Sequence, residues 1–341
     1  MFEAKLSSST ALIFKKTFEI VKDLISDTNV SCDEDGIRIQ AMDSSHVALI
    51  CVHLKDDFFK RYRCDRPVTL GMSMPSFVKL LKAAKDDDRV KLSVENEEGD
   101  VLKVDYEGRK SNRISSYTLN LLTIDGDDLS IPLQEYHAKV IMPSVEFAGI
   151  VKDLMAVHDN VAVDVSKTGF KLEASGHQAT GEVWVKSDVP VIPVTEEDDG
   201  SEDGDGHRTL VEEEEEDHKP PIIKKRKLQD LTNAHTRSSP GPSSSPDSKH
   251  KLSSLKIKRS HSQGDENEDT SNAQTIIQVT SRVSGLTFKL KYLQTICKCA
   301  ALAETVELLF SPDVPLLVRY NLGKSHGYIR YYLAPQIGDD G

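Results

Sequence analysis

The sequence predicts an α+β protein of two similar domains, each with two helices packed on antiparallel strands. Two repeated motifs indicate the duplication. Ile-Val-Lys-Asp-Leu stands at both 20–24 and 150–154, and Gly-Ile-Arg-Ile-Gln-Ala at 36–41 is matched by Gly-Phe-Lys-Leu-Glu-Ala at 169–174. The offsets of 130 and 133 residues correspond to a whole domain. In each copy the first motif lies in a helical pattern and the second alternates like a strand.

Hydrophobic spacing predicts the elements of the first copy. Apolar residues of helical period predict a helix at 11–25, and a second helix is expected at 74–85, where Pro75 suits the first turn. Apolar residues at every second position predict strands at 36–42, 46–54, 101–105 and 117–121.

The second copy repeats this arrangement. Met-Pro-Ser at 142–144 matches Met-Pro-Ser at 74–76 and leads into a predicted helix at 145–157, and a last helix is expected at 290–301. Strands are predicted at 161–165, 169–174, 180–186, 275–279, 305–310, 314–320 and 327–333.

Residues 188–272 differ from the rest in composition. They contain no Phe, Trp, Tyr or Cys, and 12 Lys+Arg stand against 20 Asp+Glu. Charge is segregated into an acidic segment at 188–217 (net −13), a basic segment at 219–259 (net +9) and a tail at 260–272 (net −4). Such a stretch cannot bury enough apolar surface to offset its ordering entropy, so we expect a disordered insertion.

The remaining sequence divides into two domains and a connector. We predict an N-terminal domain at 1–120, an interdomain connector at 121–136, and a C-terminal domain formed by 137–187 and 273–341.

Charge, hydropathy and cysteine content indicate which kinds of partner and site the chain can have. The net charge is −12, but the chain outside the insertion carries only −4, which is compatible with one basic face. No apolar run of about 18 residues predicts a membrane span. Five scattered cysteines favour a reduced, intracellular chain. Cys297 and Cys299 lack a second ligand pair at zinc spacing, so no metal or other cofactor is expected.

Lysines recur on the polar faces of the predicted helices. For one helix a solvated polar face is the simplest interpretation, but all four helices of a duplicated fold share the feature. A surface of that kind suits phosphates and is indifferent to base sequence. The lysines in regular spacing are Lys15 and Lys22, then Lys79, Lys82 and Lys85, then Lys291 and Lys298, with Lys152 alone on the third helix.

Catalytic motifs are missing from the sequence, which predicts a protein that is not an enzyme. Asp43-Ser44-Ser45-His46 contains the residue types of a hydrolytic triad. Residues so close together in a strand-to-strand segment would point apart, and a triad is defined by geometry.

Five motifs in order resemble the eukaryotic sliding clamp family of proliferating cell nuclear antigen. They are Met-Phe-Glu-Ala at 1–4, Met-Asp-Ser-Ser-His-Val at 42–47, Tyr-Arg-Cys-Asp-Arg at 62–66, Asp-Val-Pro-Leu at 313–316 and Tyr-Tyr-Leu-Ala-Pro at 331–335. The resemblance implies a ring-forming DNA clamp fold, a homotrimer around double-stranded DNA that acts as a processivity factor in the nucleus. It also implies partners: DNA polymerases, a clamp loader, and replication and DNA repair proteins with short docking peptides.

The same resemblance implies the site residues. The DNA-binding set would be Lys5, Lys15, Lys16, Lys22, Lys79, Lys82, Arg113, Lys152, Lys291 and Lys298. The partner-peptide pocket would comprise Met42, His46, Val47, Leu129, Ile131, Pro315, Tyr332, Ala334 and Pro335. Lys167 falls where the family carries a lysine for ubiquitin-type modification. Gly149 stands where the family usually has arginine, and Ser130 where it favours glycine.

The resemblance also implies that edge strands near 112–120 and 178–186 pair between subunits. The insertion leaves directly after the second of these strands. Within it, Lys224, Lys225, Arg226 and Lys227 are typical of a nuclear import signal, and Ser239 and Ser245 precede prolines as in phosphorylation sites. An inert spacer is the simpler alternative.

Three other functions remain open at this point. A subunit of a heterotrimeric checkpoint clamp would not trimerise with itself. A nuclear peptide-binding scaffold would tolerate charge reversal at Lys79, Lys82 and Lys298. A nuclease would need clustered acidic metal ligands near the lysines, and the sequence shows none.

Overall fold

The α-helices and strands follow one another in the same order in both copies, while the two 3₁₀ turns do not correspond. The computed structural model describes residues 1–85, 87–94, 100–108, 113–125, 131, 134–188, 274–323 and 326–336. The first copy runs β1 (Phe2–Leu6), α1 (Ser8–Lys22), β2 (Asp27–Asp33), β3 (Gly36–Met42), β4 (Ala48–Lys55), η1 (Asp56–Phe58), β5 (Arg61–Cys64), β6 (Val68–Ser73), α2 (Met74–Leu81), β7 (Asp88–Val94), β8 (Val101–Gly108) and β9 (Ile114–Asn120). The second runs β10 (Ala138–Pro143), α3 (Ser144–Met155), β11 (Asn160–Ser166), β12 (Gly169–Ser175), β13 (Thr180–Val185), β14 (Ile276–Val279), β15 (Val283–Lys289), α4 (Leu290–Ile296), η2 (Cys297–Ala301), β16 (Thr305–Phe310), β17 (Leu316–Asn321) and β18 (Gly327–Leu333).

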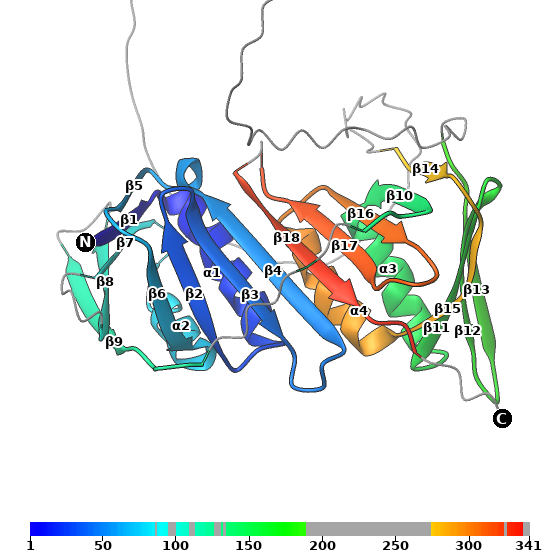
Figure 1. The fold of residues 1–341 in the computed structure, drawn as a ribbon, viewed down its shortest axis with the longest axis horizontal. Helices are drawn as coiled ribbons and strands as arrows, with labels where there is room; N and C mark the ends of the chain where they lie inside the picture. Colours follow the sequence, from blue (N-terminus) through cyan, green and yellow to red (C-terminus); the bar gives the residue numbers. More distant parts are fainter. Residues whose placement is uncertain are drawn as a thin grey trace, which may run out of the picture. The chain divides into compact units, whose positions relative to one another are not determined.

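The described strands form three antiparallel sheets (Figure 1). Their orders are β5-β1-β7-β8-β9, β14-β10-β16-β17-β18-β4-β3-β2-β6 and β13-β12-β11-β15. Each pairing within one copy has its counterpart in the other; for example, β8 with β9 corresponds to β17 with β18. The copies are joined where β4 pairs with β18. Their counterparts β13 and β9 remain edge strands, which Figure 1 draws on opposite sides of this unit.

The helix α1 begins three residues before the predicted helix because Ser7 caps it. The Ser7 hydroxyl accepts from the Thr10 amide at 3.2 Å, and the Thr10 hydroxyl accepts from the Ser7 amide at 3.0 Å. This reciprocal cap satisfies amide groups that a helix start leaves unpaired. Phe14 and Phe18 on its buried face pack against Phe77 of α2, with ring centroids 6.3 and 4.9 Å apart.

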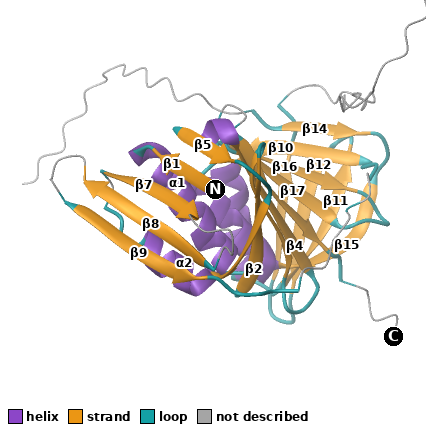
Figure 2. Cartoon of the chain, turned by 60° about the vertical axis from the view of Figure 1, so that its left-hand side comes forward, coloured by secondary structure: helices purple, strands orange, loops and turns teal. Residues whose placement is uncertain are grey.

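The other three described helices start within one residue of prediction, and all three end earlier; α3 stops at Met155 rather than at 157. α2 stops at Leu81 rather than at 85, and α4 ends at Ile296 and tightens into the 3₁₀ turn η2. Figure 2 shows the helices lying side by side against the strands, and contacts pair α1 with α2 and α3 with α4. No helix in the described part of the chain is long and apolar enough to cross a membrane.

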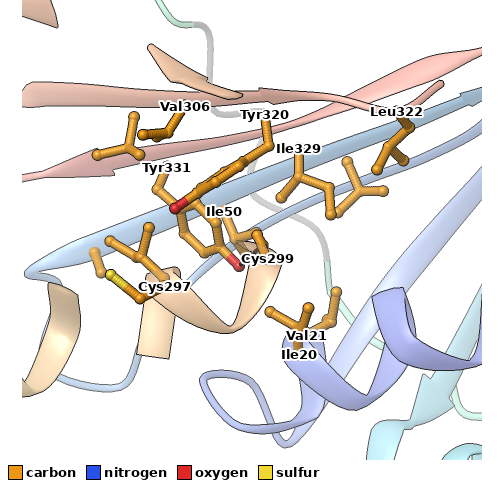
Figure 3. Packing of buried hydrophobic residues seen from close by; sticks show 14 of the residues in the cluster. Ile20, Val21, Ile50, Cys297, Cys299, Val306, Tyr320, Leu322, Ile329 and Tyr331 are labelled. Atoms are coloured by element: carbon orange, nitrogen blue, oxygen red, sulfur yellow. Dashed lines mark hydrogen bonds between the residues drawn. The ribbon is translucent and has the colours of Figure 1, made fainter. Parts of the chain in front are cut away.

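The core continues from one copy into the other. Ile20 and Val21 of α1 lie near Cys299 and Tyr331 of the second copy (Figure 3). The Cys299 sulfur and the Tyr331 hydroxyl oxygen are 3.4 Å apart. Burial raises the pKa of Cys297 and of Cys299 to about 12, so both thiols stay protonated and pack as small apolar groups.

Candidate nucleic-acid interface

The helices carry their predicted lysines on the faces that do not pack on strands. Phe14, Phe18 and Phe147 are buried on the faces that pack into the core. Lys15 stands three residues before Phe18 and Lys22 four residues after it, so both lysines lie at the border of the buried face of α1. The exposed lysines are Lys16, Lys79, Lys82, Lys152, Lys291 and Lys298, and Lys15 and Lys22 are half-buried. Seven of the ten predicted DNA contacts therefore lie on helical elements, and an eighth, Lys82, directly follows α2.

Acidic residues offset only part of this charge. Asp23, at the end of α1, lies 3.1 Å from the Lys22 nitrogen and 2.5 Å from that of Lys298 in the other copy. Partial burial raises the pKa of Asp23, but its hydrogen bonds with Lys298 and Lys22 outweigh burial and lower it. Lys82 lies 3.7 Å from Glu19. Within the described chain, Lys15, Lys16, Lys79, Lys152 and Lys291 have no ion-pair partner.

Two predicted contacts lie apart from the helix lysines. Lys5 projects from the face of β1 opposite the buried Ala4 and Leu6, and its nitrogen is 3.3 Å from Glu3. Arg113 directly precedes β9, is exposed, and donates to the Ser115 hydroxyl at 2.9 Å. The structure does not bring these two residues onto the helical surface.

Gly149 stands on the exposed side of α3, one turn before Lys152. A Cβ atom added at Gly149 would meet nothing within 4 Å. The position could therefore hold a long basic side chain, and glycine leaves this exposed position of α3 without one.

A cleft of about 900 Å³ runs beside the start of the connector. Met42 and His46 line it, and the His46 Nδ1 atom lies 3.1 Å from the Met42 sulfur. Leu122 donates its amide to the Gly71 carbonyl at 2.7 Å, and Asn29 donates to the Ile124 carbonyl at 3.0 Å. These bonds hold the first connector residues along the sheet.

The cleft also has a polar wall that sequence reasoning missed. Asp27, Arg38 and Gln40 line it together with Asp125 of the connector. The signal was available in the alternation of 36–42, because residues between the apolar positions of a strand point to the other face. The cleft is thus apolar near Met42 and charged farther along β3.

Val47, Tyr332 and Ala334 of the predicted pocket lie at the end of β18. The Ala334 amide donates to the Val47 carbonyl at 3.0 Å, and Tyr332 lies opposite Leu49 in the sheet. Ile131, Pro315 and Pro335 are half-buried, and Leu129 lies outside the described residues.

Asp43 organises the turn that carries His46. Its carboxylate accepts from the amides of Val47 and Ala48 at 2.8 and 2.7 Å and from the Ser45 hydroxyl at 2.6 Å. The Tyr292 hydroxyl of α4 donates to it at 3.1 Å. His46 has a φ of 56°, a backbone conformation that side chains other than glycine rarely adopt. Asp43 binds Ser45 while His46 contacts Met42, so no triad geometry forms.

The remaining predicted residues are surface positions or lie elsewhere. Lys167 is exposed in the turn between β11 and β12. The run 224–227, Ser239 and Ser245 lie outside the described residues. Within the described chain, no group of three or more His, Cys, Asp or Glu side chains could hold a metal ion.

Comparison with known proteins agrees with the resemblance. The family model for the N-terminal domain of proliferating cell nuclear antigen matches residues 1–129, and that for the C-terminal domain matches 130–199 and 253–336. The unmatched 200–252 falls within the predicted insertion and is consistent with it. Proliferating cell nuclear antigen of Chaetomium thermophilum is 35% identical over 340 residues, which cover 100% of both chains. The chain therefore belongs to the proliferating cell nuclear antigen family, the DNA sliding clamps.

Proposed function

We propose that three copies of this chain close into a ring around duplex DNA and act there as a processivity factor. The supporting observation is the pairing of β4 with β18 inside the chain, while β13 and β9, their counterparts, are left as edges. An open edge strand invites pairing, and a head-to-tail contact whose rotation closes produces a ring. The junction between subunits would then repeat the junction between the two copies.

The internal junction predicts the register of the external one. His53 lies opposite Tyr328, with ring centroids 5.5 Å apart in an edge-to-face arrangement. The corresponding pair between subunits is Trp184 opposite Ile114. These are large apolar side chains with 43% and 75% of their surface exposed in the single chain. Pairing would cover both, which is the expected use of apolar residues on a sheet edge.

DNA retention would come from ring topology and weak phosphate contacts. The helix lysines would contact phosphates and not the edges of the bases. The binding energy would therefore be the same at every position along the duplex, so the ring could slide. Lys15, Lys16, Lys22, Lys79, Lys82, Lys152, Lys291 and Lys298 would face the duplex, and Lys5 and Arg113 would contact DNA only outside this helical surface.

Partner proteins would dock beside the connector. Met42 and His46 on one side, and Val47 joined to Ala334 on the other, suit short peptides with aliphatic and aromatic anchors. DNA polymerases, the clamp loader and repair proteins are the proposed classes of partner. Their peptides would also meet Tyr332, Pro335, Pro315, Ile131 and Leu129.

The finer assignments complete the proposal. The domain limits are 1–120, 121–136 and 137–187 with 273–341. The import run 224–227 would direct the chain to the nucleus. Exposure of Lys167 supports its use as a modification site, and Ser239 and Ser245 would be phosphorylated. Phosphates there would reduce the charge of the basic segment.

The molar mass of the purified chain tests the ring. Light scattering should give three copies for the intact chain and one copy for Ile114→Asp, because the new carboxylate would be buried at the junction. Val145→Asp is the matched control, since Val145 is 74% exposed but lies on α3, away from both edges. A chain that is monomeric alone and assembles only with other clamp subunits would contradict the homotrimer and favour a checkpoint clamp.

A further inference from the structure

One face of the five-stranded sheet is strongly basic. Strand register places Lys5 opposite Arg61 and Lys91, and Glu3 opposite Arg63. It places Arg89 opposite Glu107, and Ser93 opposite Lys103. Opposed residues share a face, and β1 turns its buried Ala4 to the other side. We call the cations Lys5, Arg61, Arg63, Arg89, Lys91 and Lys103 the basic face.

The carboxylates on this face are already engaged. Glu3, whose side chain is 10% exposed, lies 3.1 Å from the Lys91 nitrogen and 3.3 Å from that of Lys5. Glu107 lies 3.7 Å from Arg89, and Asp105 accepts from the Ser116 hydroxyl at 2.5 Å. Asp65, directly after β5, lies 2.7 Å from Arg63. Among the described residues, six cations therefore face four carboxylates. A cavity of about 730 Å³ lies over them, bordered by Ile114 at the β9 edge.

The insertion begins at a defined point on the second copy. Asp188 donates its amide to the Thr275 carbonyl at 2.9 Å and accepts from the Thr275 amide at 2.7 Å. The two ends of the insertion are thus held together directly after β13. The segment after Asp188 must leave the sheet at this point.

The first copy indicates where that exit lies in a ring. After β4, the Lys55 amide donates to the His326 carbonyl at 3.0 Å, and Asp57 lies 3.2 Å from the His326 ring. The chain leaving β4 therefore runs over the turn between β17 and β18. By the same geometry, the chain leaving β13 would run over the neighbour's turn between β8 and β9, at the border of its basic face.

We propose that the acidic segment 188–217 of one subunit docks on the basic face of the adjacent subunit. The proposal rests on the proposed ring, which supplies the β9–β13 junction. The segment has a net charge of −13, and the basic face borders the β8–β9 turn over which the exit would run. The five strands span about 19 Å at ~4.8 Å per neighbour, a distance that about six extended residues cover. The cations of the basic face stand on four of these strands, β5, β1, β7 and β8, which span about 14 Å. The five-residue run Glu212–Glu216 covers about 16 Å when extended and can thus cross the basic face from β5 to β8.

Zero-length cross-linking tests the proposal in the full-length chain. A carbodiimide joins carboxylates to lysine amines only when they touch. Trimers are refolded from equal amounts of ¹⁵N-labelled and unlabelled chain, and their molar mass is measured on the same sample. We expect links from the acidic segment to Lys91 and Lys103, with isotope-mixed and isotope-matched pairs in equal amounts, and loss of these links in high salt.

Charge reversal provides the specific variant. Arg61→Glu with Arg89→Glu leaves the linking lysines intact and changes side chains that are 62% and 50% exposed. The yield of mixed links should fall at least about tenfold, since two attractive contacts become repulsive. Lys55→Glu with Lys289→Glu, at exposed positions of other sheets, should leave the yield unchanged.

The other possible results of the cross-linking experiment each refute a different part of the docking proposal. Intact trimers with only isotope-matched links would place the segment on its own subunit and refute docking between subunits. Intact trimers without links to the basic face, or with links that survive the charge reversal, would refute the docking surface. Monomers would refute the proposed ring and, with it, the route to the neighbouring sheet.

Discussion

Replacing Asp43 with alanine should destabilise the turn at His46 and the contact between the two copies. The carboxylate holds the Val47 and Ala48 amides and the Ser45 hydroxyl, and it accepts from Tyr292 of the second copy. Ala48 is 2% exposed, so its amide would find no water to replace the missing acceptor. One substitution therefore removes a local clamp and a link between the copies.

The free energy of unfolding that Asp43→Ala would remove can be derived from the hydrogen bonds of Asp43 and from its pKa. Burial raises the pKa of Asp43, but the hydrogen bonds from Ser45, Ala48 and Val47 outweigh burial and lower the pKa from 3.8 to about 2. At ~1.4 kcal/mol per pKa unit, this corresponds to about 2 kcal/mol of stability at neutral pH. Unsatisfied amides add to the loss, so Asp43→Ala should lower the free energy of unfolding by about 3 kcal/mol.

The sign of the pH dependence follows from the lowered pKa. The folded protein stabilises the ionised carboxylate of Asp43 more than the unfolded chain does. The stabilisation is therefore full above about pH 4 and is lost as the pH falls through about 2. Denaturant unfolding between pH 7 and 2.5 should show a shallower decline in Asp43→Asn than in the unchanged protein.

Tyr292→Phe is the control that separates the two roles. It removes one donor and keeps the ring, so it should cost about 1 kcal/mol and leave the His46 turn in place. Asp43→Ala should also weaken binding of docking peptides, whereas Tyr292→Phe should not. An Asp43→Ala protein with unchanged unfolding energy and unchanged peptide affinity would refute this reasoning.

Three further changes test other parts of the account. Gly149→Ala should stabilise the protein by up to about 1 kcal/mol, since no atom obstructs the new methyl group and alanine favours helix; a loss of stability in denaturant unfolding would mean that the glycine is needed for packing. Lys79→Ala with Lys152→Ala should reduce the slope of log affinity for DNA against log salt by about 0.9 for each phosphate that is no longer neutralised, and an unchanged slope would remove these lysines from the interface. Deleting 189–273, which leaves Asp188 and its partner in place, should preserve the trimer by light scattering, whereas monomers would make the insertion structural.

Much of the fold could be predicted because the duplication shows every element twice. The strand at 36–42 has its predicted limits, and its counterpart at 169–174 is one residue longer in the structure. The start of α1 was predicted three residues late because hydrophobic period does not show a polar cap, and Ser7 supplies one. The helix at 290–301 was predicted too long, because apolar spacing does not separate an α-helix from a 3₁₀ turn.

The site was predictable where it depends on helical spacing and less so where it depends on sheet register. The helix lysines follow from intervals of three and seven residues. The position of Lys5 depends on which face of β1 is buried, and that is known only once β1 pairs with β5 and β7. The role of Asp43 depends on Tyr292, which is 249 residues away in the sequence, so no local pattern reveals it.

Retention on circular DNA tests the central claim most directly. The clamp is loaded onto a closed circle, and the salt concentration is raised until free protein no longer binds. We predict that loaded protein stays on the circle in high salt and is released when one enzyme cut makes the circle linear, because topology and not affinity holds it. Release by salt from the intact circle, or retention after the cut, would contradict a ring that encloses DNA.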